Sequence, residues 1–429
     1  MKSSNKGHYG SLSIISILNI IATLCFPILG IGLIGVGLNS DIYFSGIVIS
    51  QFISLIFSIL IINITVPYLS NLMESEITGA LAELSSIGFL ASLIISIVLL
   101  ICSGPLLNFL FPSLIEQASN RLNIVFYLSI LFIPLNILIS ILIAGEYSKD
   151  SYIRVEYTSL VATSLSIAAI LFYSSSLNLI LFLQISIARF ILIFIFLARR
   201  NLLQSFKFFS LSKYKGVFSS SSQYTANLAL TKSDPLVDRA LISSSEFQSG
   251  LLTIYSLSYQ FILISSSLIA KVFGNRTLHS LSNKGKDRSQ LLKKFQFHFK
   301  QLLVVSLVIS CSLYFFGDII LAYALTSFKY SIEIVEEVYF YMILLLGLLI
   351  GGSLRQLVEN LYHSTKFTKQ FSWISSLNFC IFLVLKLTLF YFFSAEGICY
   401  AISIYAIFDP LILFFVYLSY SKSWQENYA

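Results

Sequence analysis

The residues most able to do chemistry stand together near the middle of the chain. Four charged side chains and two amides fall within one short stretch: Gln223, Asn227, Lys232, Asp234, Asp238 and Arg239. Pro235 interrupts this stretch, and Asp234 and Asp238, four residues apart, share one face of a helix. Basic groups of this kind pair with phosphate oxygens. The two carboxylates could bind a coupling proton or Na⁺, or neutralise the basic groups, and neutralisation is the favoured interpretation.

Three further charged candidates occur later in the sequence: Lys271, Arg355 and Glu359. The spacing of Arg355 and Glu359 predicts an ion pair on one helix face, although both could also line a polar path. Glu359 joins the two aspartates as a candidate for ion coupling or charge neutralisation. Arg189 and Lys386 also lie within predicted spans and are further basic candidates, although they could belong to peripheral helices.

The elements that must position these side chains are membrane spans. Charged residues make up 11% of the 429-residue chain and hydrophobic residues 57%, whereas soluble proteins are about 25% charged. A bilayer core needs about 20 apolar residues per helix, and backbone groups in lipid must be paired within the span. We predict twelve helices, at about 11–36, 42–69, 80–103, 122–144, 155–174, 177–198, 217–242, 250–273, 298–317, 334–361, 371–393 and 397–420. Charged residues at this depth usually face a water-filled cavity.

The basic residues predict the orientation of these spans. Most of the 27 lysines and arginines fall in alternate connections, which places that side and both termini in the cytoplasm. The longest cytoplasmic loop, Gly274–Lys300, is expected to touch the headgroups or to form an amphipathic surface helix. Leu12–Val36 is too long for a signal-peptide core and is predicted to be a retained span. The expected location is therefore the cytoplasmic membrane.

The remaining composition points away from metal, disulfide and nucleic-acid chemistry. The five cysteines all lie in apolar runs without a CxxC spacing, so they are expected to be small buried hydrophobes. No metal or cofactor is predicted. The basic excess is explained by topology, and no extramembrane domain that could bind nucleic acid is evident. No outer loop is long enough for an extramembrane catalytic domain, which argues against an enzyme.

The two halves of the chain resemble each other weakly. Ser103–Leu107 closes the third predicted span and Phe316–Ile320 closes the ninth at the matching place. We therefore predict two six-helix lobes, residues 1–205 and 206–429. Because six is even, the repeat is parallel, and a site is expected between the halves near the midplane.

The start of the second half also resembles a known family. The matching positions are Asp238, Arg239, Gly250, Tyr255, Tyr259, Leu281 and Ser282. This pattern is similar to the polysaccharide and lipid-linked oligosaccharide exporters of the MOP superfamily, in which an acidic–basic pair precedes a glycine, an aromatic-x-x-x-aromatic span and a P-x-L-S-like exit. The exit proline is missing near residue 278, whereas the first half has Pro67.

The resemblance implies an all-α polytopic membrane protein with about twelve helices in two lobes around a central cavity, working by alternating access. The Wzx-type O-antigen flippases are the most similar group. They turn a polyprenyl-pyrophosphate-linked oligosaccharide, a unit of lipopolysaccharide or polysaccharide biosynthesis, across the bacterial inner membrane. The implied partners are this substrate, membrane lipids and a coupling H⁺ or Na⁺.

Three alternatives stay open at this stage. A MATE-like multidrug exporter often has an acidic residue in its first span, and Leu12–Val36 has none. A lipid II flippase typically has extra spans and cationic residues in that first span. A membrane polysaccharide polymerase would need a large outer loop, and an acyltransferase an intramembrane histidine; His8, His279, His298 and His363 fall in or beside cytoplasmic loops.

Overall fold

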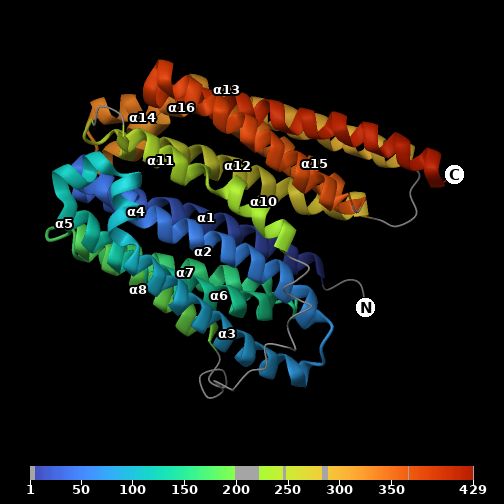
Figure 1. Ribbon diagram of the computed structural model, residues 1–429, viewed down its shortest axis with the longest axis horizontal. Helices are drawn as coiled ribbons and strands as arrows, with labels where there is room; N and C mark the ends of the chain where they lie inside the picture. Colours follow the sequence, from blue (N-terminus) through green and yellow to red (C-terminus); the bar gives the residue numbers. More distant parts are fainter. Residues whose placement is uncertain (1–4, 199–221, 245–247, 283–287, 366, 429) are drawn as a thin grey trace. The chain divides into compact units, whose positions relative to one another are not determined.

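A computed structural model describes residues 5–198, 222–244, 248–282, 288–365 and 367–428. Within these ranges the protein is helical and has no strand (Figure 1). The helices of the first part are α1 (Asn5–Ile34), α2 (Leu38–Ser70), α3 (Glu74–Ile101), α4 (Ser103–Leu110), α5 (Pro112–Ser129), α6 (Phe132–Tyr147), α7 (Tyr152–Phe172) and α8 (Leu179–Leu197). They are followed by α10 (Ser222–Lys232), α11 (Asp234–Ser244), α12 (Leu251–Ser282), α13 (Arg288–Thr326), α14 (Ile332–Leu344), α15 (Leu346–Ser364) and α16 (Thr368–Tyr428).

The described helices account for each predicted span. Nine are long and apolar enough to cross a bilayer, and the pair α14–α15, bent by 43°, makes a tenth. α16 has 61 residues and is broken at Ser394, so it supplies two spans, as the predicted ranges require. The polar pair α10–α11 corresponds to the seventh predicted span. The chain is therefore an all-α, multi-pass membrane protein.

Several helices are longer than predicted. The expected outer loop 104–121 is mostly helical, because it contains α4 and the first turns of α5. α13 has 39 residues, or about 58 Å at the usual helical rise, which exceeds a hydrocarbon core of about 30 Å. Within the described ranges, most connections between the helices are only a few residues long.

The chain forms two compact units, Met1–Thr253 and Ile254–Ala429. In the first unit α2 packs against α5 and α6, and α10 and α11 also pack against α2. That packing explains why the seventh span groups with the first unit by contact, although the sequence repeat predicts a lobe boundary after residue 205. The division of the chain into repeat-related lobes stays a prediction.

Small residues bring the helices of the first unit together. A Cβ on Gly46 would lie 2.6 Å from the side chain of Val125, so α2 and α5 approach closely there. One turn away, Ser129 donates to the carbonyl of Gly46 at 2.9 Å and shares a hydrogen bond with Ser50, also at 2.9 Å. The hydrophobic effect does not drive helices together in a membrane, because lipid tails are as apolar as the side chains. Close packing and hydrogen bonds between helices hold them together instead.

The second unit is built around a hairpin within α16. Ser394 has φ 52 and ψ −133, and the helix turns back there. The two arms approach so closely that a Cβ on Gly397 would lie 2.1 Å from the carbonyl oxygen of Leu389. α15 packs along α16, where Gly351 meets the backbone of Ala406.

The sequence around residues 291–299 forms the start of α13. Phe295 is only 1% exposed and stacks on Phe414 of α16, with ring centroids 4.7 Å apart. The apolar face in this part of the predicted surface loop therefore packs against the protein itself.

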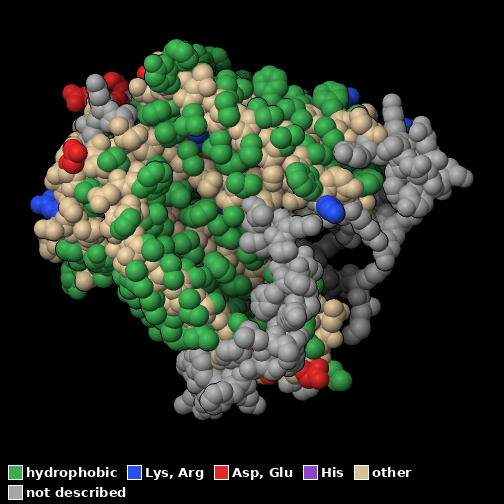
Figure 2. Space-filling view, in the orientation of Figure 1, with side chains coloured by type: hydrophobic (Ala, Val, Ile, Leu, Met, Phe, Trp, Pro, Cys, Tyr) green, Lys and Arg blue, Asp and Glu red, His purple; other side chains and the backbone are tan. Residues whose placement is uncertain are grey.

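Apolar side chains dominate the outer surface. On the face shown in Figure 2, hydrophobic side chains are spread over much of the described area and charged groups are few. Large exposed apolar residues occur on helices of both units, among them Phe109, Phe172, Phe315, Tyr391 and Phe392. A surface of this kind is solvated by lipid rather than water.

Candidate functional site

The polar seventh span is broken at the residue before Asp234. α10 ends at Lys232 and α11 begins at Asp234, with Pro235 in its first turn. Proline has no N–H to continue the hydrogen bonds of α10, and it is well tolerated in the first turn of a new helix. Asp234 in that turn interacts favourably with the positive end of the helix dipole. Local sequence therefore explains the two short helices in place of one long one.

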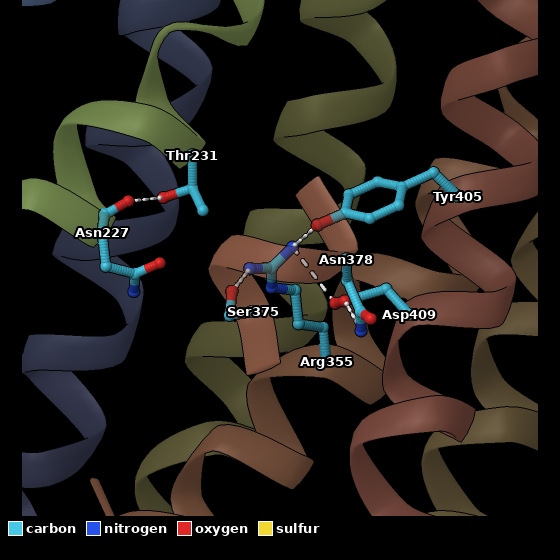
Figure 3. A network of polar contacts seen from close by, with 7 residues as sticks. All are labelled: Asn227, Thr231, Arg355, Ser375, Asn378, Tyr405 and Asp409. Atoms are coloured by element: carbon cyan, nitrogen blue, oxygen red, sulfur yellow. Dashed lines mark hydrogen bonds and ion pairs between the residues drawn. The ribbon is translucent and has the colours of Figure 1, made fainter. Parts of the chain in front are cut away.

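The candidate residues of this span differ in exposure. Lys232 is exposed, Asp234 and Arg239 are partly buried, and Asp238 is 1% exposed. Asn227 is 7% exposed, and its carbonyl accepts a hydrogen bond of 3.0 Å from the Thr231 hydroxyl (Figure 3). The side chain of Gln223 lies outside the described residues. The predicted cluster is thus one polar segment packed against α2, with its second carboxylate in the protein interior.

Arg239 is held against α2 by backbone and ring contacts. Its Nη1 donates to the carbonyl of Phe44 at 2.9 Å, and its guanidinium carbon lies 5.5 Å from the centre of the Phe44 ring. Both contacts leave the positive charge of the guanidinium intact. The arrangement fixes a cation on the α2 side of the polar span.

Asp41 supplies a buried carboxylate on the same helix, and the sequence prediction missed it. Its Oδ2 accepts the N–H of Gly250 at 2.6 Å, and its Oδ1 accepts the N–H and the hydroxyl of Thr253 at 2.9 and 2.6 Å. Asp41 therefore caps the first turn of α12, where a negative charge is favourable. The sequence did contain a signal for Asp41, because this residue lies directly before the predicted second span.

The second unit contains a polar network centred on Arg355. Nη1 of Arg355 lies 3.2 Å from Oδ2 of Asp409 and donates to the Tyr405 hydroxyl at 3.0 Å, while Nη2 donates to Ser375 at 2.9 Å (Figure 3). The Asn378 amide donates to Oδ1 of Asp409 at 2.9 Å. The arginine thus joins α15 to both arms of the α16 hairpin.

The structure gives Arg355 an ion-pair partner that the sequence did not indicate, and the predicted pair with Glu359 stays a prediction. The ion pair is with Asp409, whose side chain is 0% exposed, while the Arg355 side chain is 27% exposed. An arginine four residues before a glutamate is the weaker order on a helix, because the side chain of the arginine points back toward the N-terminus, away from the acid. Glu359 is partly buried.

Sequence reasoning missed Asp409 and its partners Ser375, Asn378 and Tyr405. The signal was present, since Asp409 precedes Pro410 within the last apolar span, as Asp234 precedes Pro235 in the seventh. Lys386 is 0% exposed, with Nζ 4.5 Å from the centre of the Phe382 ring. The side chain of Lys271 lies outside the described residues.

The candidate residues fall into the two units separately. Lys232, Asp234, Asp238 and Arg239 belong to the first unit, and Arg355 and Glu359 to the second. No group of three or more metal-ligating side chains is present among the described residues. Each unit therefore holds its own set of intramembrane polar residues.

Comparison with known proteins identifies the fold. No family model and no curated protein sequence matches the chain. Among solved structures, the lipid II flippase MurJ in an inward closed conformation has a TM-score of 0.76 at 18% identity, covering 94% of this chain and 87% of that one. An inward-facing multidrug resistance MATE family transporter of the MOP superfamily has a TM-score of 0.75 at 12% identity, covering 97% and 100%. A Vibrio cholerae MATE transporter has a TM-score of 0.63 at 13% identity, covering 96% of both chains.

These similarities establish the architecture. The chain has the all-helical fold of MurJ and of the MATE transporters over nearly its whole length. The proteins it resembles are transporters and flippases rather than enzymes. At 12–18% identity the likeness concerns the fold alone.

Proposed function

We propose that the protein is a flippase that moves a polyprenyl-pyrophosphate-linked oligosaccharide, such as an O-antigen or polysaccharide repeat unit, across the cytoplasmic membrane by alternating access. The diphosphate and the sugars cannot cross hydrocarbon, so they need a hydrated and cationic path, while the lipid tail stays in the bilayer. The fold shared with a lipid II flippase is compatible with a substrate of this kind.

The observation that carries the proposal is Arg239 within a broken, polar span. A charged side chain at membrane depth costs several kcal/mol unless it faces a polar environment. Arg239 lies in α11 and is fixed on α2 through the Phe44 carbonyl, and the exposed Lys232 ends the preceding helix. Phosphate oxygens are the strongest small partners for such donors.

The carboxylates of the first unit fit a supporting role. Both oxygens of Asp41 already accept hydrogen bonds from the start of α12, so this carboxylate serves the fold. Asp238 is buried next to Arg239 in sequence. In the proposed mechanism Asp238 and Asp234 neutralise the basic residues when the substrate is absent, and a coupling proton or Na⁺ is an additional role for them.

A MATE-like cation-coupled multidrug exporter is the second candidate. The buried carboxylate of Asp238 favours it, because an organic cation or a proton would need an acidic group in the membrane. The fold is equally compatible with this function. The two candidates differ in the sign of the charge that the protein must recognise.

The experiment that separates them is a charge series at position 239. For a flippase, outer-leaflet exposure of the lipid-linked glycan in cells falls in the order wild type, Arg239→Lys, Arg239→Ala, Arg239→Glu, at equal protein levels. Arg121→Ala is the matched control, since Arg121 is exposed and, among the described residues, hydrogen-bonds to Asn39 at 3.1 Å. Full glycan exposure in Arg239→Glu, with altered drug resistance, would instead support the exporter.

A further inference from the structure

Two helices of the second unit each present a continuous stripe of exposed apolar side chains. On the first arm of α16 the stripe consists of Leu377, Ile381, Val384, Leu387 and Tyr391. On α13 the stripe consists of Val304, Val308, Cys311, Phe315 and Ile319. Residues three or four positions apart share one face of a helix, so each helix turns one apolar face outward. In a membrane protein these two faces contact lipid.

Both stripes continue at one end into lysine and aromatic side chains. On α16, Lys369 and Trp373 precede the stripe at the same spacing, and Trp373 is 73% exposed. On α13, Phe297 is 59% exposed and lies on the exposed face between Lys293 and Lys300. We call these groups the α16 cluster (Lys369 and Trp373) and the α13 cluster (Lys293, Phe297 and Lys300).

The order of the spans places the two clusters on one side of the membrane. α13 crosses the bilayer, the bent pair α14–α15 returns, and α16 begins on the side from which α13 started. The charge distribution of the chain predicts that this is the cytoplasmic side. Anionic phospholipids give the cytoplasmic leaflet its negative surface potential.

Distances along the helices place the clusters at the edge of the hydrocarbon core. Trp373 and Tyr391 are about 27 Å apart along α16 at the usual helical rise. Lys300 and Asp318 enclose a stretch of α13 of the same length that has no charged residue. A hydrocarbon core is about 30 Å thick, and tryptophan and tyrosine concentrate at its two edges. Lys300 and Lys369 therefore lie at the level of the lipid headgroups.

The lysines of the two clusters are accessible to an anion. Lys293, Lys300 and Lys369 are exposed, and no ion pair joins any of them to a residue that the structure describes. Inorganic phosphate would contact only the lysines. A phospholipid also explains why each cluster includes an exposed ring at the edge of the hydrocarbon, where the ring contacts the upper part of the acyl chains.

We propose that the α13 and α16 clusters bind the headgroups of anionic phospholipids such as phosphatidylglycerol. The lysines attract the negative headgroup, and Phe297 and Trp373 pack beside its acyl chains. This interaction does not depend on the transported substrate, so it holds for a flippase and for an exporter alike.

Trp373 is a built-in reporter for the test. The chain has two tryptophans, so Trp424→Phe leaves Trp373 as the single fluorophore. The full-length variant is reconstituted in vesicles of phosphatidylcholine with a minor share of phosphatidylglycerol. Bromine, which quenches tryptophan on contact, is placed on the acyl chains of one lipid at a time, at equal mole fraction. We expect phosphatidylglycerol to be enriched about fivefold around Trp373, which corresponds to about 1 kcal/mol for one lysine near the surface.

Variants of Lys369 test whether this charge causes the preference. Lys369→Gln should remove the enrichment of phosphatidylglycerol while brominated phosphatidylcholine still quenches Trp373, and Lys369→Arg should keep the enrichment. High salt should weaken it in the parent protein, because salt screens exposed charges. Lys329→Gln is the matched control, since Lys329 is exposed in the turn at the opposite end of α13, and it should leave the preference unchanged.

The α13 cluster is tested in the same way. Phe297→Trp, in a protein with Trp373→Phe and Trp424→Phe, moves the reporter to α13. We expect the same enrichment there, and its loss when Lys293→Gln and Lys300→Gln are combined.

Three results would overturn the inference for the cluster that is tested. Equal quenching by the two brominated lipids would show that the cluster has no preference for the anionic headgroup. An enrichment that survives the lysine-to-glutamine change would show that the lysines do not cause it. A reporter that neither brominated lipid quenches would not face the bilayer. None of these results would affect the proposal for the transported substrate.

Discussion

The intramembrane charges of this protein are stabilised in three different ways. Asp41 is satisfied by backbone and hydroxyl donors, Asp409 by an arginine and an amide, and Arg189 by aromatic rings. The first two arrangements close on themselves and serve the fold. For Arg189 the part of the chain that the structure describes offers aromatic rings and no ion pair.

Asp41 gives a prediction for stability. Asp41→Asn keeps the size of the side chain but turns an NH₂ group toward backbone donors at the start of α12. We expect a loss of about 1–3 kcal/mol in unfolding free energy, the cost of leaving buried donors unsatisfied. Thermal unfolding of the purified protein measures it. Glu333→Gln, at an exposed position, should change little, and equal stability of the two variants would contradict the capping role.

The Arg355–Asp409 pair predicts strong coupling. Arg355→Met leaves a buried carboxylate without its cation and should destabilise the second unit by about 3–5 kcal/mol. The double variant Arg355→Met with Asp409→Leu removes both charges and should be clearly more stable than Arg355→Met alone. A double-mutant cycle by unfolding provides the measurement. Additive effects would mean that the two side chains do not depend on each other.

At the element scale, helix breaks position the polar side chains. The break before Asp234 was predicted from Pro235, and the turn at Ser394 falls between the predicted spans 371–393 and 397–420. The short helix α4 was not predicted, because its sequence, with Gly104 and Pro105, is typical of a loop. Helical periodicity gives the spans, whereas proline and glycine locate only some of their ends.

Close helix packing in the second unit predicts a position where a methyl group is not tolerated. A Cβ on Gly351 would lie 1.8 Å from the carbonyl oxygen of Ala406, so Gly351→Ala must push α15 away from α16. We expect a loss of about 1–3 kcal/mol or more. Gly104→Ala is the control, since nothing lies within 4 Å of its Cβ position and alanine favours the helix. Similar stability of both variants would refute the tight contact.

At the scale of the whole molecule, sequence was sufficient for the fold class and the number of spans, and insufficient for the pairing of side chains. In a membrane helix, the faces that contact lipid and the faces that contact other helices are equally apolar. The sequence therefore does not show which faces pack together. The partner of Arg355 therefore came from a span that contributed no candidate to the predicted site.

The charge distribution predicts the topology. In a protein without its native cysteines, Ser176→Cys should react with a membrane-impermeant maleimide in intact cells, because it lies between the fifth and sixth predicted spans on the outer side. Met73→Cys, on the cytoplasmic side, should react only after permeabilisation. Both positions are exposed in the structure, and Met73 is 72% exposed. Labelling of Met73→Cys in intact cells would invert the proposed orientation.

We propose that the protein moves a diphosphate-linked lipid through contacts with Arg239. The most direct measurement is flipping of a purified polyprenyl-pyrophosphate-linked oligosaccharide in proteoliposomes, followed by its accessibility to an added sugar-binding protein. We predict flipping by the wild type and by Arg121→Ala, and loss of about ten- to a hundredfold in rate for Arg239→Ala. Wild-type flipping by Arg239→Glu at equal protein density, or no flipping by the wild type while it exports organic cations, would contradict the account.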